Sequence, residues 1–401
     1  MRILHVVGDS NPAMGGAIEG VFQLGDAYRA MGHVQELLTL DAPDDPWVAA
    51  APSPVHALGH QRTEAPGALG QWAEKLRPPT QAISWLRTNL ANYDAVVVDG
   101  LWNTSTLTAR WVLPRAGVPY AVFSHGMLDP YFRTTQPGKE WIKRQLFRVN
   151  ERVLLRGAEA ALFTTQQERD LAIEAWPGWK KIESEVVGFG TGEPPVRSPA
   201  MAAAFAEAVP DAAGEPYLLF LSRLHPKKGC EILLEAFATA DLPANLRLVM
   251  AGPGDAGYVT KLRAQAEALG IGARTDWPRM LSGNAKWGAL YGCEAMALIS
   301  HQENFGVVVA EALACARPVV ISDQVNLHGT ISAAGSGIVC DNNAPSAREA
   351  LATIMAMSRE DRTAMGQAGR TQFDREFAMR RTAERILALF ERSQNESTNN
   401  G

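Results

Sequence analysis

The sequence predicts an α/β protein built of two domains. The chain has 401 residues, more than the roughly 250–300 that one hydrophobic core usually supports. Apolar segments of strand length alternate with segments of helical length and spacing, which is typical of parallel sheets covered by helices. The densest Gly/Pro segment, residues 188–199 (GFGTGEPPVRSP), lies near the middle and is interpreted as a linker. We therefore place the domains at residues 1–190 and 191–377.

In the first domain, the opening strand (2–8) is followed by a glycine-containing loop and a helix that ends near Met31, the start of a nucleotide-binding α/β unit. The loop is not GxGxxG, so Gly15 and Gly16 either lie against a ligand or form an ordinary turn. Residues 41–80 are rich in Pro, Ala, Gly and His and are predicted to be largely irregular. Further strands are expected at 34–40, 55–58, 94–99, 119–123, 160–164 and 184–187, and helices at 81–90, 105–113, 141–156 and 166–175.

His125 follows directly after the strand at 119–123, in the sequence Ser124-His125-Gly126. Open α/β sheets bind ligands at the carboxyl ends of their strands. A single histidine is often structural, but this position favours contact with a ligand.

The segment 141–156 (WIKRQLFRVNERVLLR) is amphipathic. One face carries Ile142, Leu146, Val149 and Val153, and basic residues repeat every four positions at Arg144, Arg148, Arg152 and Arg156. Two interpretations remain open: a solvated surface, or attraction to an anionic membrane or a pyrophosphate-bearing acceptor.

In the second domain, the segment Ser300 to Ser322 predicts an anion site. An apolar strand (295–299) leads through Glu303, Asn304, Phe305 and Gly306 into a helix at 307–314. The first N–H groups of a helix lack intrahelical partners and attract anions, and Gly306 would let a phosphate approach closely. Other strands are expected at 217–222, 247–251, 273–277 and 318–322, and other helices at 229–238, 256–269 and up to Gly292.

Two carboxylates and two cations accompany this anion site. Because Glu303 and Glu311 would repel a phosphate, sugar hydroxyls are their expected partners. Alternatively, Glu303 interacts only with the dipole of the helix from its first turn, and Glu311 is a solvated helix position. Glu311 lies among apolar residues, however, so its charge needs a partner. Arg223 and Lys228, in the sequence SRLHPKKG, follow the carboxyl end of a strand, so they are expected at the same edge of the sheet as Glu303. Two cations beside a helix end indicate a diphosphate site.

Charge and composition limit the kinds of binding partner and the cellular compartment that can be expected. The net charge of −5 gives no case for nucleic-acid binding. The chain opens directly on a strand, no apolar run approaches the ~20 residues that cross a bilayer, and no cysteines form a CxxC pair. We therefore expect reduced thiols and a cytoplasmic protein, at the inner face of the plasma membrane if the basic helix binds lipid. A helix at 378–391 and a disordered tail at 393–401 are expected to end the chain.

These motifs resemble the retaining GT-B glycosyltransferases of glycosyltransferase family 4. The resemblance rests on R-x4-K at Arg223 and Lys228, Gly252-Pro253-Gly254, and E-x7-E at Glu303 and Glu311. The stretches HGMLDP and SHQENFG resemble the branch that builds bacterial exopolysaccharides, capsules and O-antigens. The resemblance implies two Rossmann-like domains facing across a cleft, with the last segment (378–401) returning to the first domain.

The resemblance also implies roles for single residues. Arg223, Lys228 and Gly16, with the backbone at Phe305, Gly306 and Val307, would contact the donor diphosphate. Glu303 would bond sugar hydroxyls near the reacting carbon, and His125 would contact the sugar near the reaction centre, so these two are the expected catalytic residues. Asn304 would contact the donor sugar and Glu311 the ribose. Met280 lies in the loop that contacts the nucleobase in relatives, where Pro278 and Arg279 depart from the family pattern and leave the base open. Arg317 stands where relatives usually have a small or apolar residue.

The implied function is hexosyl transfer from a nucleoside-diphosphate sugar to a lipid-linked saccharide, with retention of configuration. No cofactor or metal is expected, since the sequence has no DxD motif and the cations can stabilise the leaving diphosphate. Two alternatives remain: a non-catalytic nucleotide-sugar-binding subunit of a polysaccharide-assembly complex, and a nucleotide-sugar epimerase of the same fold.

Overall fold

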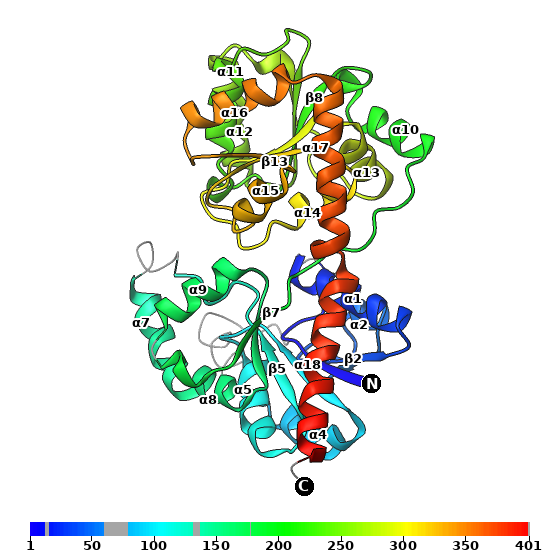
Figure 1. Cartoon of the computed structure of the whole chain (residues 1–401), viewed down its shortest axis with the longest axis vertical. Coiled ribbons are helices and arrows are strands. Elements are labelled where there is room, and N and C mark those ends of the chain that lie inside the picture. The colour runs from blue at the N-terminus through cyan, green and yellow to red at the C-terminus, as the bar shows by residue number, and fades with distance from the viewer. Residues whose placement is uncertain (13–15, 60–78, 131–136, 177, 400–401) are drawn as a thin grey trace. The chain divides into compact units, whose positions relative to one another are not determined.

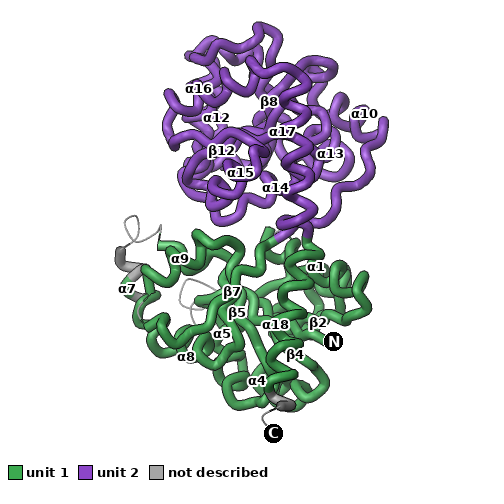
Figure 2. The backbone as a smooth tube through the Cα atoms, viewed as in Figure 1, with its two compact units in different colours: residues 1–189, 379–401 green, residues 190–378 purple. Residues whose placement is uncertain are grey.

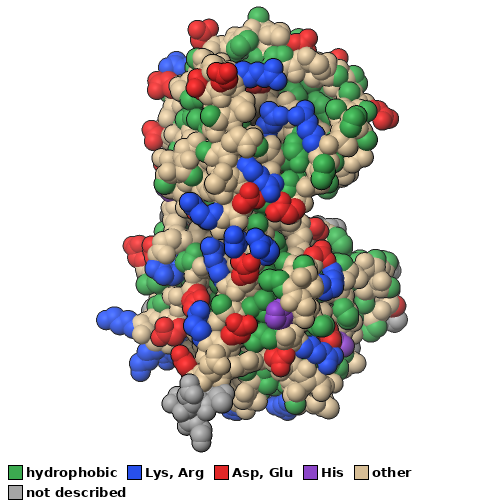
Figure 3. Space-filling model, turned by 45° about the vertical axis from the view of Figure 1, so that its right-hand side comes forward, with side chains coloured by type: hydrophobic (Ala, Val, Ile, Leu, Met, Phe, Trp, Pro, Cys, Tyr) green, Lys and Arg blue, Asp and Glu red, His purple; other side chains and the backbone are tan. Residues whose placement is uncertain are grey.

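The computed structural model describes residues 1–12, 16–59, 79–130, 137–176 and 178–399. They form two compact units, residues 1–189 with 379–399, and residues 190–378 (Figure 2). Each unit has one parallel sheet with flanking helices (Figure 1), so the predicted pair of Rossmann-like α/β domains is confirmed. Basic and acidic side chains lie interspersed on the face drawn in Figure 3.

Unit 1 contains a seven-stranded sheet in the order β3-β2-β1-β4-β5-β6-β7. The strand order reverses between β1 and β4, and ligands of open α/β sheets bind at such a switch point. The strands are β1 (Arg2–Val6), β2 (Val34–Thr39), β3 (Val55–Ala57), β4 (Ala95–Asp99), β5 (Tyr120–Phe123), β6 (Ala160–Phe163) and β7 (Ser184–Val186). The helices are α1 (Gly16–Ala30), α2 (Pro46–Ala49), α4 (Thr80–Asn89), α5 (Thr104–Val112), α7 (Pro137–Leu146), α8 (Arg152–Gly157), α9 (Gln166–Ala175) and α18 (Met379–Asn399).

Unit 2 contains a six-stranded sheet in the order β10-β9-β8-β11-β12-β13. Its strands are β8 (Tyr217–Leu221), β9 (Arg247–Ala251), β10 (Thr275–Asp276), β11 (Ala295–Leu298), β12 (Val319–Ser322) and β13 (Gly337–Cys340). Its helices are α10 (Pro199–Ala208), α11 (Cys230–Thr239), α12 (Ala256–Ala268), α13 (Gly283–Gly292), α14 (Val307–Ala314), α15 (His328–Ala334), α16 (Ala344–Ala356) and α17 (Arg359–Gln372). Of these elements, the sequence patterns do not predict α10, α15, α16, α17 or β13.

The basic segment differs from the amphipathic helix that was predicted. A π-helical turn, Phe147–Glu151, separates α7 from α8, and the extra residue in such a turn rotates the faces of the helix. The prediction that Leu146, Val149 and Val153 form the buried face is wrong, because all three are exposed. The buried side chains belong instead to Phe147, Asn150, Glu151, Leu154 and Leu155.

The predicted disordered tail is wrong as far as Asn399, because α18 continues through residues 393–399. Two contacts within unit 1 hold this extension of the helix. Arg392 forms an ion pair with Glu185, and Gln394 Nε2 donates to the carbonyl of Asp94 at 3.3 Å. Helix α18 also packs against α1.

A close backbone approach joins two loops at the carboxyl edge of the unit 2 sheet. Gly229 has φ +62°, and a Cβ there would lie 1.8 Å from the carbonyl oxygen of Ile299. The N–H of His301 donates to the carbonyl of Lys227 at 2.9 Å. Glycine is required because any side chain would push the loop before α11 away from the end of β11.

We expect Gly229→Ala to destabilise unit 2 more than Gly335→Ala does. Gly335 has almost the same backbone angle, φ +60°, but a Cβ there would meet nothing within 4 Å. Gly335→Ala should therefore cost only the left-handed penalty of about 1–2 kcal/mol. Gly229→Ala should cost a further ~1–3 kcal/mol for the clash. Urea unfolding of both variants measures the difference, and equal losses would contradict the close approach.

Candidate functional site

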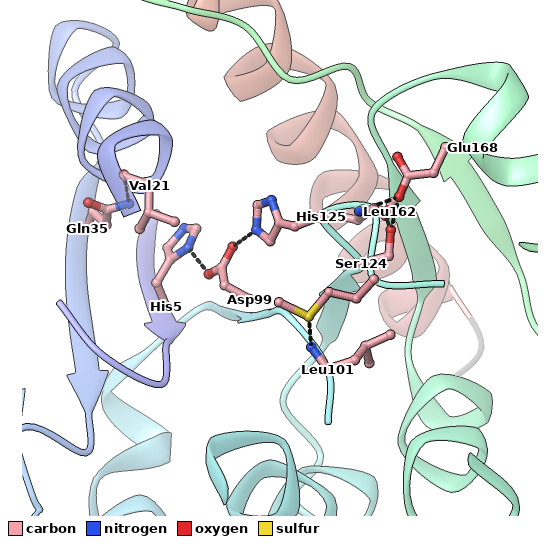
Figure 4. Close-up of polar contacts among 11 residues, drawn as sticks. His5, Val21, Gln35, Asp99, Leu101, Ser124, His125, Leu162 and Glu168 are labelled. Carbon is pink, nitrogen blue, oxygen red and sulfur yellow. Dashed lines mark hydrogen bonds and ion pairs between the residues drawn. The ribbon is translucent and has the colours of Figure 1, made fainter. Parts of the chain in front are cut away.

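In unit 1, three side chains form a hydrogen-bonded row beside the switch point of the sheet (Figure 4). Asp99 ends β4, His125 follows β5 and His5 lies in β1. His125 Nε2 lies 2.9 Å from Asp99 Oδ1, and His5 Nδ1 lies 2.7 Å from Asp99 Oδ2. Because a carboxylate only accepts, both histidine rings donate to it, and the Nδ1 of a neutral His125 is left as an acceptor.

The row is buried. His5 is 0% exposed and Asp99 is 5% exposed. Burial alone would raise the pKa of Asp99, but the charge of His5 and the hydrogen bonds from His125 and His5 outweigh it and lower this pKa to about 2. Asp99 therefore stays ionised and fixes the orientation of His125.

His125 is held in an unusual conformation. Its φ is +46° and that of Gly126 is +77°, a region that non-glycine residues enter only when their surroundings demand it. The His125 ring stacks on Phe123, with ring centroids 4.2 Å apart, and meets Phe189 edge-on at 5.3 Å. The buried carboxylate of Glu168 anchors the turn by accepting from the N–H of Gly126 at 2.8 Å and from the hydroxyl of Ser124.

In unit 2, Lys228 and Glu303 meet at the amino end of α14. Lys228 Nζ forms an ion pair with Glu303, and the Lys228 side chain is about nine-tenths buried. Gly306 has φ +73° and precedes the first residue of α14. A Cβ on Gly306 would lie 3.2 Å from Glu303 Cγ. The structure thus brings together the lysine, the glutamate and the helix end predicted to meet an anion.

The backbone of Glu303 is held on both sides. Its N–H donates to the carbonyl of Gln324, and its carbonyl accepts from the N–H of Asn326, both at 3.0 Å. This pairing positions the loop before α14 independently of the ion pair.

Glu311 is buried in α14 and has a partner that the sequence did not reveal. Its Oε1 accepts from Lys286 Nζ of α13 at 2.6 Å. The expectation that the Glu311 carboxylate needs a partner agrees with this contact. A ribose would have to share Glu311 with Lys286 or replace it.

The remaining predicted residues are placed less tightly. Arg223 is exposed after β8, and Met280 is 69% exposed. Asn304 accepts from Asn326 Nδ2 at 3.4 Å, whereas the Phe305 side chain is buried against Phe377, so only its backbone could meet a ligand. In unit 1, Gly16 begins α1 with nothing within 4 Å of a Cβ, and Gly15 lies outside the described residues. Arg144 and Arg148 are exposed, Arg152 is partly buried, and Val307 begins α14 half-buried.

Three site residues were missed by reasoning from sequence: His5, Asp99 and Lys286. A signal existed for Asp99, since a carboxylate ends a fully buried strand, AVVVD, beside the strand that ends before His125. His5 and Lys286 resemble ordinary strand and helix residues in the sequence. Over the described residues, no group of three or more His, Cys, Asp or Glu side chains could hold a metal ion. Each helix in the same part of the chain is too short or too polar to span a bilayer.

A parallel α/β sheet with cations and a helix end at its carboxyl edge defines a nucleotide-binding class of protein. Comparison with known families identifies the class of protein more closely. Residues 15–190 match the model "Glycosyl transferase 4-like domain", and residues 204–372 match "Glycosyl transferases group 1". The chain belongs to the glycosyltransferases of GT-B fold, with a 4-like first domain and a group 1 second domain.

Curated relatives carry glycosyltransferase names. A D-inositol 3-phosphate glycosyltransferase of Segniliparus rotundus is 32% identical over 181 residues, which cover 44% of this chain and 40% of the relative. One from Xylanimonas cellulosilytica is 29% identical over 220 residues, covering 51% of this chain and 49% of the relative. The matched segment thus spans only about two fifths to half of these relatives.

Solved structures share the fold along almost the whole chain. Sucrose-phosphate synthase from Thermosynechococcus elongatus superposes with a TM-score of 0.77 at 19% identity, covering 98% of this chain and 99% of that one. Anabaena HepE in complex with UDP and glucose gives 0.74 at 20% identity, with the same coverage.

The pairing of Asp99 predicts a pH-dependent stability. Because its pKa in the folded protein lies below the ordinary value, the Asp99 charge stabilises the fold above about pH 4, and this contribution is lost as the pH falls toward 2. Between about pH 5 and pH 2, the unfolding free energy of the wild type should fall by roughly 2 kcal/mol more than that of Asp99→Asn. Urea unfolding at several pH values measures this, and parallel pH profiles would refute the assignment.

Proposed function

We propose that this protein is a retaining, metal-independent hexosyltransferase that uses a nucleoside-diphosphate sugar. The observation that carries the proposal is the meeting of Lys228 and Glu303 at the amino end of α14. A lysine and a helix amino end suit a diphosphate, and a carboxylate beside them suits the hydroxyls of the attached sugar. Complexes of Anabaena HepE with UDP and with UDP-glucose support a donor of this class.

The Lys228–Glu303 pair would exchange partners when the donor binds. Lys228 would turn to the diphosphate and Glu303 to sugar hydroxyls, so that neither charge is left without a partner in a partly buried site. Arg223, exposed at the same edge of the sheet, would supply a second cation. These cations and the α14 dipole would stabilise the negative charge that develops on the departing diphosphate.

His125 would contact the donor sugar near the reacting carbon. Its ring is oriented through Asp99 and clamped by Phe123 and Phe189, so its free nitrogen is presented in one direction. The leaving phosphate would take the acceptor proton on the front face, since the carboxylates of both units would be held by other contacts: Asp99 by the histidines, Glu303 by sugar hydroxyls and Glu311 by the ribose.

The acceptor is proposed to be a lipid-linked saccharide of a bacterial surface polysaccharide. Arg144 and Arg148 are exposed on the same segment as Trp141, Leu146, Val149 and Val153. Basic and apolar side chains together suit the headgroup region of an anionic membrane, so we place the protein at the cytoplasmic face of the plasma membrane. A second candidate acceptor is an inositol phosphate, which the names of the curated relatives favour.

A transfer assay tests the proposal. The protein is incubated with UDP-, GDP- and ADP-sugars in EDTA, with either lipid-linked saccharides in phosphatidylglycerol vesicles or soluble inositol 3-phosphate. We expect transfer to the vesicle-bound acceptor with the anomeric configuration retained. Transfer to inositol phosphate alone would replace the acceptor, and donor binding without any transfer or hydrolysis would favour a non-catalytic subunit. Sugar interconversion without an acceptor would indicate an epimerase.

We expect Glu311→Gln to weaken binding of the matching nucleoside diphosphate about 10–100-fold. A hydrogen bond to a charged group contributes roughly 1.5–3 kcal/mol, and the amide keeps the size of the side chain. Glu349→Gln is a matched control because Glu349 is exposed on α16 of the same unit. Calorimetric titration measures both, and wild-type affinity in Glu311→Gln would remove Glu311 from the ribose site.

A further inference from the structure

A hollow in unit 2 lies away from the proposed donor site. It has a volume of about 410 Å³ and is lined by residues directly before β11 and β12, Glu294 and Pro318. Glu303 and Gly306 follow the opposite, carboxyl end of β11. Four residues of β11 at about 3.3 Å each separate the two edges by roughly 13 Å, so the hollow is a separate place in the fold.

The lining of the hollow is strongly basic. It contains four arginines and a single carboxylate, which leaves an excess of three positive charges: Arg197, Arg317, Arg359, Arg362 and Glu294. The volume falls within the range of small-molecule sites, about 300–1,000 Å³. Such a charge excess in a concave site attracts anions.

Two of these arginines have structural roles. Arg362 pairs with Glu294, with Nη2 3.0 Å from Oε2, and its Nη1 donates to the carbonyl of Met357 after α16. Arg317 donates from Nη2 to the carbonyl of Tyr291 near the end of α13. The carboxylate of Glu294 is therefore already neutralised, and it would not repel an anion as an isolated charge would.

The other two arginines of the lining are not engaged in this way. Within the described part of the chain, Arg197 and Arg359 are exposed and have no ion-pair partner. Over the same residues, the Nε–H of Arg317 is buried without a hydrogen-bond acceptor. A bound anion or its water would supply the missing acceptor.

The backbone around the hollow is held by close contacts. A Cβ on Gly366 of α17 would lie 2.1 Å from the carbonyl oxygen of Ala316, a residue that itself has φ +53°. Tyr291 donates its hydroxyl to the carbonyl of Pro195 at 3.0 Å, which ties the segment carrying Arg197 to α13. Arg359 and Arg362 lie three residues apart on one face of α17.

We propose that this hollow binds a small soluble anion that carries a phosphate group, at a site separate from the donor diphosphate. Arg197 and Arg359 would bind the phosphate oxygens through their planar guanidinium groups, and Arg317 would complete the site. The proposal does not depend on the reaction assigned above, because none of its residues belongs to the donor site.

Titration with inorganic pyrophosphate tests the proposal. The double variant Arg197→Gln/Arg359→Gln should bind pyrophosphate at least about tenfold more weakly than the wild type at one class of site. Arg223→Gln, at the opposite sheet edge, should keep that site. Arg348→Gln is the matched control, because Arg348 is an exposed arginine on α16 that does not line the hollow.

A second variant guards against a folding defect in the double variant. Thr363→Glu adds a negative charge to the lining at an exposed position, and it should weaken the same class of site with an unchanged melting temperature in phosphate-free buffer. Wild-type pyrophosphate binding in both variants would overturn the proposal. It would also be overturned if the hollow variants lost binding only to phosphatidylglycerol vesicles while no soluble anion bound.

Discussion

The site in unit 2 depends on backbone contacts that only glycine permits. A Cβ on Gly229 would lie 1.8 Å from the carbonyl oxygen of Ile299, and one on Gly252 would lie 1.8 Å from that of Ser222. These approaches hold neighbouring loops together at the carboxyl edge of the sheet. Lys228 directly precedes Gly229, so the first of these contacts places its ammonium group beside Glu303, which lies 75 positions later in the sequence. The chemistry of the edge thus follows from steric fit in the backbone.

Both carboxylates associated with α14 are paired with lysines from other elements. The helix sequence VVVAEALA has no other polar side chain, and an isolated charge there would be costly to bury. Lys286 neutralises the charge of Glu311, and Lys228 neutralises the charge of Glu303 just before the helix. A ligand with phosphates and hydroxyls can take over either half of each pair, so the same contacts that stabilise the fold are suited to binding a nucleotide sugar.

The sequence was most informative where one strong pattern decided the structure. The bounds of β9 and α14 were predicted to the residue, since an apolar run beside a Gly-Pro-Gly turn and a helical run after Gly306 allow few alternatives. It failed where tertiary contacts decide. The segment 141–156 buries Phe147, Leu154 and Leu155 instead of the predicted face. Helix α17 (REDRTAMGQAGRTQ) is too polar to be identified by hydrophobic periodicity. The His5–Asp99 contact joins residues 94 positions apart through adjacent strands, and local patterns carry no such information.

Helix α13 connects the two anion sites proposed for unit 2. Near its start, Lys286 holds Glu311, and near its end, the carbonyl of Tyr291 accepts from Arg317. An anion that drew Arg317 away would leave a carbonyl at the end of α13 without its charged donor, where the helix dipole is negative and a cation stabilises it. Lys286, which pairs with Glu311 beside the proposed ribose site, belongs to the same helix. The arginine proposed to complete the second anion site and the lysine beside the first are therefore joined by a single helix.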